Sequence, residues 1–346
     1  MSLEKFKLEL ILFKALLINL EIMQTAQIVI GLAIILFTYL DFFHTTLSGN
    51  GFGIFSRIVN QILNRIMIQN RTRTIFKFSG ITHLLITTFL WMLLLFIGTY
   101  IVFSAGEEMV VNSTTGLPAT HPERFYYTGY VLSTLGIGDF VPGTDTSRIL
   151  TGILAFSGFI LITTGLTYLL SVLNAVLAKK QLSFLISTMG KDIEEIFIFY
   201  KQQDDLENLI SNAGDLRQQI LKNASSYLAF PMANYFLSKN HESALILQLA
   251  RLYEVIMIIR LDWNEETVQY KKLTAIINGI KKYLELGLED ANAASHNEEE
   301  LKTYRSHWMN HGYYFKNEIA VDKQFSSSLK YAGWNWKEVY KLKDED

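Results

Sequence analysis

Cysteine is absent from the 346-residue chain, and proline is rare, with four residues. The lack of cysteine excludes disulfide bonds, thiolate metal sites and thiol redox switches. An excess of one charge is also missing, because 31 basic and 33 acidic side chains leave a formal net charge of −2. A net charge this close to zero does not indicate a large basic surface, so nucleic acid is not expected as a partner.

Charge is also missing from most of three long apolar stretches in the first half of the chain. A helix needs about 20 apolar residues to cross the ~30 Å apolar core of a bilayer, and buried helices of soluble proteins rarely run so far without a charge. The second half is instead rich in Lys, Glu, Asp, Asn and Gln. The sequence therefore predicts a membrane domain followed by a soluble domain, with spans at residues 24–44, 81–106 and 149–178.

The ends of the first span carry charged groups that need a separate interpretation. Residues 1–23 are helical in pattern but have charged side chains at positions 7, 9, 14 and 21, which would be costly inside a bilayer. We expect them to form an interfacial helix or an extension of the first span, rather than a fourth span. Asp41 and His44 lie at the other end, where they could be an interfacial capping group or a proton-linked pair.

The charges of the loops predict the orientation in the membrane. Residues 48–80 form a basic linker with no acidic residue, whereas residues 107–147 contain five acidic residues and one arginine. The positive-inside rule places the linker in the cytoplasm and residues 107–147 outside, and Lys179 and Lys180 keep the rest of the chain in the cytoplasm. Apolar residues recur at helical spacing in the linker, which favours a helix on the inner leaflet surface.

The region after residue 178 shows apolar residues at three- and four-residue spacing, which predicts a soluble α-helical domain over residues 179–346. No G-x-G-x-x-G follows a strand, and no nucleophile–base set or phosphate-binding loop is present. An enzyme is therefore not expected.

The segment STLGIGDF, residues 133–140, lies between the second and third spans. A short apolar half-helix, residues 124–133, precedes the glycines and is too short to span, which is typical of a re-entrant loop. Irregular backbone at membrane depth is tolerated where it lines a water-filled path or is buried in protein. Gly136 and Gly138 can adopt positive φ and aim successive carbonyl oxygens at one axis, where those oxygens replace the water around a cation. The Thr134 hydroxyl can add another ring of oxygens.

These residues resemble the potassium-channel signature Thr-Val-Gly-Tyr-Gly-Asp at six consecutive positions: Thr134, Leu135, Gly136, Ile137, Gly138 and Asp139. Pro142 and the paired aromatics Tyr126 and Tyr127 also fit the family pattern. The likeness covers residues 81–178, as an outer helix, a pore loop and an inner helix.

The resemblance implies a homotetramer that conducts K⁺ as its transported ion, with membrane lipids and monovalent cations as its other partners and no cofactor. It implies that the ion binds at Thr134, Leu135, Gly136, Ile137 and Gly138, and that Tyr126, Tyr127, Tyr130 and Asp139 support the filter. For Tyr130 we expect the hydroxyl to support Asp139. Gly158 falls where many relatives place a hinge glycine and Gly165 is a second candidate, although small residues also serve helix packing in membranes.

The departures from the family pattern leave alternatives open. Ile137 replaces the usual tyrosine, so a less selective cation channel with the same architecture remains possible, as does a membrane-tethered helical sensor or scaffold with a degenerate pore. No span carries the spaced arginines of a voltage sensor.

The expected fold class is a membrane all-α protein with a helix–pore loop–helix unit, an extra N-terminal span and a soluble helical C-terminal domain. Its segments are an N-terminal helix, a basic linker, a pore domain and a cytoplasmic domain, at residues 1–47, 48–80, 81–178 and 179–346. The protein is expected in the cell membrane as a multi-pass protein.

Overall fold

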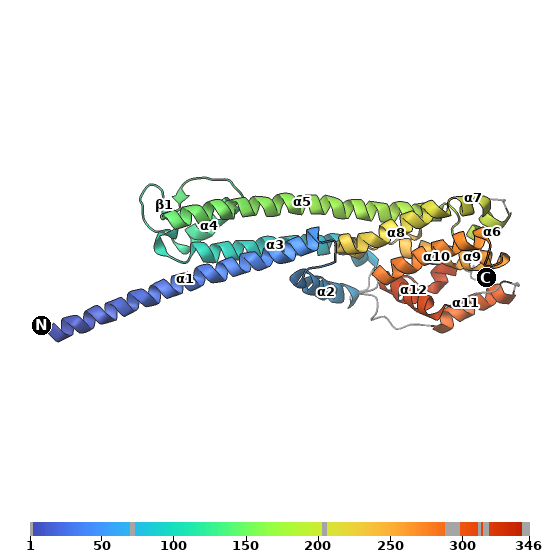
Figure 1. Cartoon of the computed structure of the whole chain (residues 1–346), viewed down its shortest axis with the longest axis horizontal. Coiled ribbons are helices and arrows are strands. Elements are labelled where there is room, and N and C mark those ends of the chain that lie inside the picture. The colour runs from blue at the N-terminus through green and yellow to red at the C-terminus, as the bar shows by residue number, and fades with distance from the viewer. Residues whose placement is uncertain are drawn as a thin grey trace. The chain divides into compact units, whose positions relative to one another are not determined.

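The computed structural model describes residues 3–69, 73–202, 206–287, 298–310, 313 and 318–340. Arg71 of the basic linker lies outside these residues. The chain divides into two compact parts, which are described separately (Figure 1). The transmembrane part consists of residues 1–44, 53–56 and 85–169, and the helical part consists of residues 45–52, 57–84 and 170–346. The long helices α1, α3 and α5 contribute to both parts.

The elements that build the transmembrane part are α1 (Leu3–Leu47), α3 (Arg73–Phe103), η1 (Glu107–Met109), β1 (Val111–Asn112), α4 (His121–Leu132), β2 (Phe140–Val141) and α5 (Asp145–Ser187). Within the described residues, three segments are long and apolar enough to cross a membrane: Ile11–Leu47, Phe78–Phe103 and Asp145–Ser187. The predicted all-α membrane fold with three spanning helices is therefore confirmed. Each helix is longer than the apolar stretch that predicted it, because the polar residues at its ends continue the helix.

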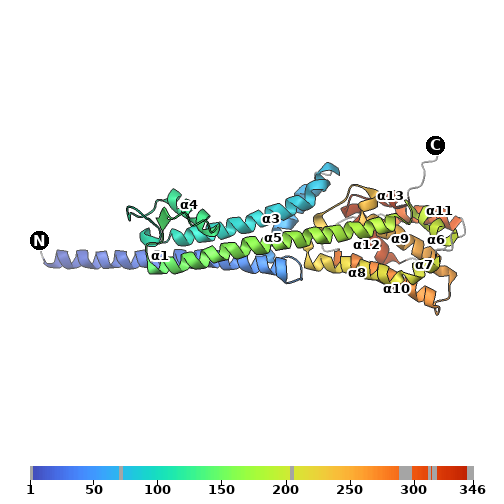
Figure 2. The ribbon, with the colours of Figure 1, turned by 90° about the horizontal axis from the view of Figure 1, so that it is seen from above.

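Close backbone contact joins α1 to α3. A Cβ added to Gly31 would lie 2.6 Å from the carbonyl oxygen of Gly98, so glycine on α1 lets the two backbones meet. Further along the same pair, the Phe42 and Trp91 rings meet edge to face with centroids 5.0 Å apart. Figures 1 and 2 both show α4 beside the C-terminal end of α3 and the N-terminal end of α5.

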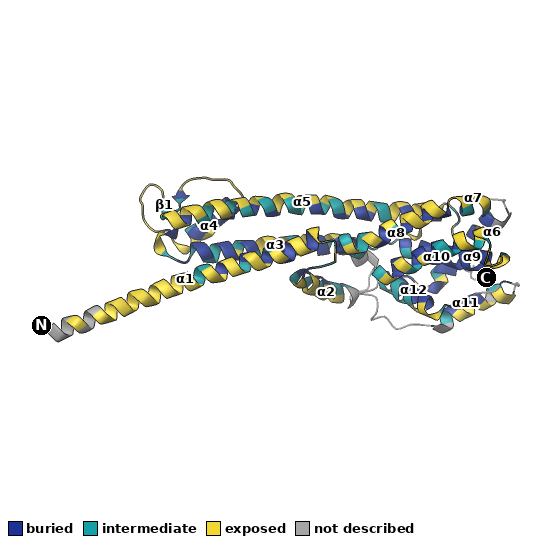
Figure 3. Cartoon of the chain, viewed as in Figure 1, coloured by how far each residue is buried: buried dark blue, intermediate teal, exposed yellow. Residues whose placement is uncertain are grey.

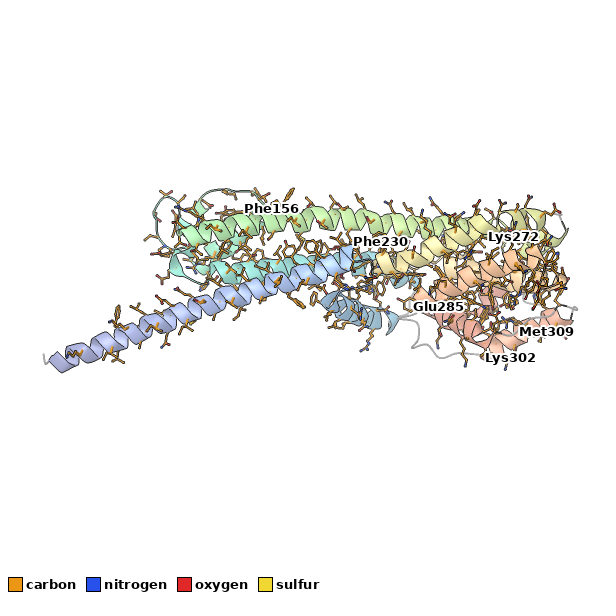
Figure 4. All side chains as sticks on the ribbon, viewed as in Figure 1. Phe156, Phe230, Lys272, Glu285, Lys302 and Met309 are labelled. Atoms are coloured by element: carbon orange, nitrogen blue, oxygen red, sulfur yellow. The ribbon has the colours of Figure 1, made fainter. Side chains whose placement is uncertain are left out.

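Large apolar side chains remain exposed on the long helices (Figure 3). On α5, Leu154 and Leu161 are buried against the rest of the transmembrane part, whereas Ile149, Ile153 and Phe156 are exposed. Phe156 projects from the side of α5 opposite α3 (Figure 4). A membrane helix that exposes this much apolar surface needs lipid or further protein around it.

The helical part is built around α9 (Leu245–Ile259), which is buried on every side. The remaining elements are α2 (Ile54–Gln69), α6 (Ile193–Gln202), α7 (Leu206–Ser211), α8 (Ala213–Ala229), η2 (Pro231–Tyr235), η3 (His241–Ser243), η4 (Arg260–Asp262), α10 (Val268–Gly287), α11 (Glu298–Asn310), α12 (Ile319–Tyr331) and α13 (Trp336–Tyr340). Most residues of α9 are apolar, which suits a helix in the centre of a core, and its few polar side chains, among them Arg251 and Glu254, are buried with it.

A buried charge cluster joins three helices of this core. The Arg305 guanidinium on α11 donates to Glu254 on α9 at 2.7 and 3.0 Å and to Asp322 on α12 at 2.8 Å. Burial raises the pKa of Asp322, and the adjacent guanidinium opposes that rise. The Tyr340 hydroxyl also donates to Glu254. Two carboxylates can stay buried here because one guanidinium binds both of them.

Helix α2 lies in the predicted basic linker and has an exposed apolar stripe. Ile54, Ile58, Ile62 and Ile66 are spaced four residues apart and are all exposed. This spacing gives the amphipathic pattern of a helix that lies on a membrane surface. The position on the inner leaflet stays a prediction.

Candidate ion-conduction site

The helix α4 begins at a well-formed cap. Thr120 is the N-cap residue, and Glu123 returns its carboxylate to the Thr120 backbone N–H at 2.7 Å, which completes a capping box. The hydrogen bonds from the Thr120 backbone and hydroxyl lower the pKa of Glu123, so its carboxylate stays ionised. The helix ends at Leu132, and its observed bounds, His121–Leu132, lie slightly before the predicted 124–133.

Arg124 holds the first turn of α4 in place, a role that the sequence analysis did not find. Its buried guanidinium donates to three carbonyl oxygens: those of Ala119 at 2.9 Å and of Ser104 and Glu107 at 3.3 Å. Two of these acceptors follow the end of α3, so one side chain ties the pore helix to the second span.

The predicted support residues are tyrosines on α4, and each has a different partner. The Tyr127 hydroxyl lies 2.8 Å from the Thr151 hydroxyl on α5, and Tyr126 interacts electrostatically with the Asp139 carboxylate. Tyr130 donates to the carbonyl oxygen of Phe140. This differs from the expectation that Tyr130 supports the Asp139 carboxylate. Tyr130 is buried and its hydroxyl reaches the backbone just beyond Asp139.

The backbone of the predicted filter alternates in handedness. The angle φ is positive at Thr134 (58°), Gly136 (59°) and Gly138 (88°), and it is negative at Leu135 and Ile137 between them. An alternating sign of φ allows successive peptide groups to turn toward the same side of the chain. Two of the three positive values fall on glycine, which adopts them without strain. This is the backbone geometry that a row of cation-binding carbonyl oxygens requires.

Backbone hydrogen bonds hold both ends of the predicted filter, and the residues between those ends are exposed. At the inner end, the Leu135 N–H donates to the Tyr130 carbonyl at 2.9 Å. At the outer end, the Ser113 N–H donates to the Asp139 carbonyl at 2.9 Å, and β2 pairs with β1 just beyond it. A Cβ added to Gly136 would meet nothing within 4 Å.

The side chains in the filter also face away from their own chain. Leu135 is 67% exposed and Ile137 is 52% exposed, although both are large apolar residues. Thr134, Gly136 and Gly138 are exposed as well. All five predicted ion-binding residues therefore lie on a surface that this chain alone does not cover.

Charges around the filter favour a cation. The 12-residue helix α4 directs its C-terminal end toward Thr134, and a helix C-terminus carries about half a negative charge. Glu107, Glu108 and Asp139 are exposed near the outer end, where carboxylates raise the local concentration of cations.

Comparison with known proteins matches this region to a family. Residues 86–175, which contain α4, the filter and most of α5, match the family described as Ion channel. This region is an ion-channel domain. Over 241 residues the chain is also 27% identical to the uncharacterized membrane protein YdjJ of Bacillus subtilis (strain 168), covering 69% of this chain and 71% of the relative. No solved structure matches.

The two predicted hinge glycines differ in their surroundings within the channel domain. A Cβ on Gly158 would lie 2.3 Å from the carbonyl oxygen of Leu132, at the end of the pore helix. A Cβ on Gly165 would meet nothing within 4 Å. Gly158 thus provides close packing between α5 and α4. Whether either glycine acts as a hinge remains a prediction.

Asp41 of the transmembrane part shows the geometry of a cap. Its buried carboxylate accepts hydrogen bonds from the backbone N–H groups of Phe55 and Ser56 at the start of α2, from the Ser56 hydroxyl, and from the Trp91 indole at 2.9 Å. These donors join α1 to α2 and α3. The capping interpretation therefore describes Asp41 without requiring a proton-linked partner.

Proposed function

We propose that the chain forms a K⁺-selective channel, a homotetramer in the cell membrane with its C-terminal domain in the cytoplasm. The single observation that supports this most is the alternating backbone from Thr134 to Gly138, which covers five of the six positions that resemble the potassium-channel signature. Conduction is passive and involves no catalytic step and no cofactor. Dehydrated K⁺ is held by the carbonyl oxygens of the filter and by the Thr134 hydroxyl.

The proposed homotetramer combines the number of filter segments in one chain with the four-unit pore that the resemblance to potassium channels implies. A ring of carbonyl oxygens needs several copies of the filter around an axis, and each chain has one signature segment. The exposure of Leu135 and Ile137 and the exposed apolar residues of α5 support further copies on these surfaces. The basic linker and the acidic residues between the second and third spans support the orientation.

A less selective monovalent cation channel is the second candidate, and Ile137 favours it. A tyrosine at this position would have a hydroxyl to fix the filter width, whereas Ile137 has no polar group and is half exposed in the single chain. Any rigidity at this height must come from neighbouring groups, such as the hydrogen bond from the Tyr130 hydroxyl to the Phe140 carbonyl.

The test is single-channel recording of the purified protein in bilayers under bi-ionic K⁺ and Na⁺ conditions. A K⁺-selective pore gives a strongly shifted reversal potential, whereas equal permeability to both ions supports the second candidate and refutes K⁺ selectivity. Recording again after truncation at about residue 185 shows whether the pore needs the helical domain.

Gly136→Ala tests the filter, and Gly152→Ala is its matched control. Gly136 has positive φ, where a side chain is strained, while a Cβ on Gly152 meets nothing within 4 Å and needs no unusual φ. We expect Gly136→Ala to abolish K⁺ flux in a tetramer that still assembles, and Gly152→Ala to conduct. A monomeric protein that passes no ions would instead support the scaffold interpretation.

A further inference from the structure

A cavity of about 790 Å³ lies within the helical part. Leu173, Val176 and Leu177 of α5 and Ile81 of α3 form its apolar wall, together with residues of α8, α9, α10 and α12. Ile81 is the first residue of the predicted second span and follows the basic linker. Leu173, Val176 and Leu177 lie near the end of the predicted third span, just before Lys179 and Lys180. The volume falls in the range of about 300–1,000 Å³ that is usual for small-molecule sites.

Three lysines line the same cavity: Lys179, Lys180 and Lys239. The Lys179 ammonium donates to the Phe236 carbonyl at 3.3 Å. No acidic side chain among the described residues lines the cavity, and none of the three lysines forms an ion pair with a described carboxylate. Cations gathered in a partly apolar wall repel one another, and a bound anion would relieve that repulsion.

One further polar group faces the same space. The side-chain oxygen Oδ1 of Asn234 is buried and has no hydrogen-bond partner in the described part of the chain. A buried acceptor without a donor is costly, and a ligand hydroxyl would satisfy it. The wall therefore offers charge for an anion, an acceptor for a hydroxyl, and apolar surface for a hydrocarbon.

We propose that this cavity binds a phosphate-bearing amphiphile. Its phosphate contacts Lys179, Lys180 and Lys239, a hydroxyl donates to Asn234, and its apolar part packs on Leu173 and Leu177. The headgroup of an acidic phospholipid and a soluble phosphate with an apolar tail share this chemistry. Leu173, Val176 and Leu177 lie at the end of the predicted third span, and Lys179 and Lys180 follow them on α5. Along α5 the cavity therefore presents an apolar and then a cationic surface, in the order in which a lipid presents its chains and headgroup.

Binding at this position would change the restraint on α5. The ligand would contact Leu173 to Lys180 on α5 and, across the cavity, Tyr283 of α10 and Ser328 of α12. If α5 is the pore-lining helix, as the proposed function has it, occupancy would alter channel opening. This consequence rests on the proposed function, whereas the binding itself does not.

Binding is measured by native mass spectrometry of the detergent-purified full-length chain. The probes are dioleoyl phosphatidylglycerol and geranyl monophosphate, with dioleoyl phosphatidylcholine and inorganic phosphate as comparisons. The test variant is Lys179→Gln, Lys180→Gln and Lys239→Gln together. The control removes the same charge from exposed sites, by Lys222→Gln, Lys271→Gln and Lys272→Gln; Lys272 is labelled on α10 in Figure 4.

We expect one anionic amphiphile per chain, bound about fivefold more weakly for each lysine lost and about 100-fold more weakly for the three, with no change in the control. Tight binding of phosphatidylglycerol identifies a lipid, and tight binding of geranyl monophosphate alone identifies a soluble ligand. Equal binding of phosphatidylcholine, equal binding of inorganic phosphate, or unchanged binding in the triple variant overturns the proposal.

A second variant keeps the test decisive if the triple variant does not fold. Ala332→Phe adds bulk to the cavity wall and leaves all three lysines in place, so it should also reduce binding at least tenfold. Retained binding in this variant would place the ligand elsewhere. Channel recording with and without phosphatidylglycerol then tests the effect on opening; loss of binding in a non-conducting protein still supports the site and counts only against the proposed function.

Discussion

The contact of Gly158 with the end of the pore helix makes Gly158→Ala a sharp test of the channel domain. The new Cβ would lie 2.3 Å from the Leu132 carbonyl oxygen and 3.0 Å from the Leu132 Cα. Carbon–oxygen contacts are about 3.3 Å or longer, so α4 and α5 must separate by about 1 Å. The obstacle is backbone, so no side-chain rotation can relieve the clash.

The cost can be compared with that of Gly165→Ala on the same helix. Overpacking costs about 1–3 kcal/mol, whereas alanine in place of glycine in a helix gains about 1 kcal/mol. Gly165→Ala should show only the gain in helix stability, because its Cβ would meet nothing within 4 Å and would cause no overpacking. The two variants should therefore differ by about 1–3 kcal/mol in the free energy of unfolding, with Gly158→Ala the less stable.

The effect on conduction follows from the hydrogen bonds at the end of α4. The Leu135 and Thr134 N–H groups bind carbonyls in the last turn of α4, so a displacement of about 1 Å passes into the filter. We expect Gly158→Ala to lower the K⁺ over Na⁺ permeability ratio in bi-ionic recording, and Gly165→Ala to keep it. Equal stability in detergent and an unchanged ratio in Gly158→Ala would refute the packing argument. A normal ratio with rarer opening would favour a hinge.

Three further substitutions test other contacts. Asp41→Asn removes the charge that accepts hydrogen bonds from four donor groups and should lower the free energy of unfolding of the purified protein by about 1–3 kcal/mol; an unchanged melting curve would contradict the capping role. Arg305→Met leaves two buried carboxylates without their cation and should cost about 3–5 kcal/mol near pH 8. Burial already raises the pKa of Asp322, and a carboxyl with a raised pKa contributes stability that is present at low pH and lost as the pH rises through its folded-state pKa. The loss of stability caused by Arg305→Met should therefore shrink toward pH 5. A loss that is independent of pH would count against the mechanism. Tyr130→Phe deprives the Phe140 carbonyl of its donor and should weaken K⁺ selectivity while tetramers, counted by native mass spectrometry, persist; unchanged reversal potentials would show that this bond does not shape the filter.

The spans and the pore loop could be predicted because their signals are local. An apolar run of about 20 residues has few alternatives to a membrane helix, and alternating glycines in Thr134–Asp139 permit positive φ at alternate positions. The positive φ at Gly136 and Gly138 agrees with that reasoning. The positive φ at Thr134 does not follow from its residue type and depends on the turn that ends α4.

The contacts that hold the filter were harder to predict because their partners are distant backbone atoms. Arg124 binds carbonyls 17 and 20 residues away, and Tyr130 binds a carbonyl rather than the nearby carboxylate. Every residue has a carbonyl oxygen, so the residue type does not show which carbonyl will accept a hydrogen bond. The strands β1 and β2 have two residues each, which is too short for an alternating pattern to be recognised.

The hydrogen bonds of Asp41 suggest where the first helix lies relative to the apolar core of the bilayer. Asp41 binds backbone N–H groups at the start of another helix, and the interfacial position expected for it would place it at one face of the bilayer, as a marker of that face. Twenty residues at about 1.5 Å each cover the ~30 Å apolar core and end at Glu21, the next acidic residue toward the N-terminus. Counted from this marker, Lys7 and Lys14 emerge beyond the opposite face, and their charges need no partner within the lipid.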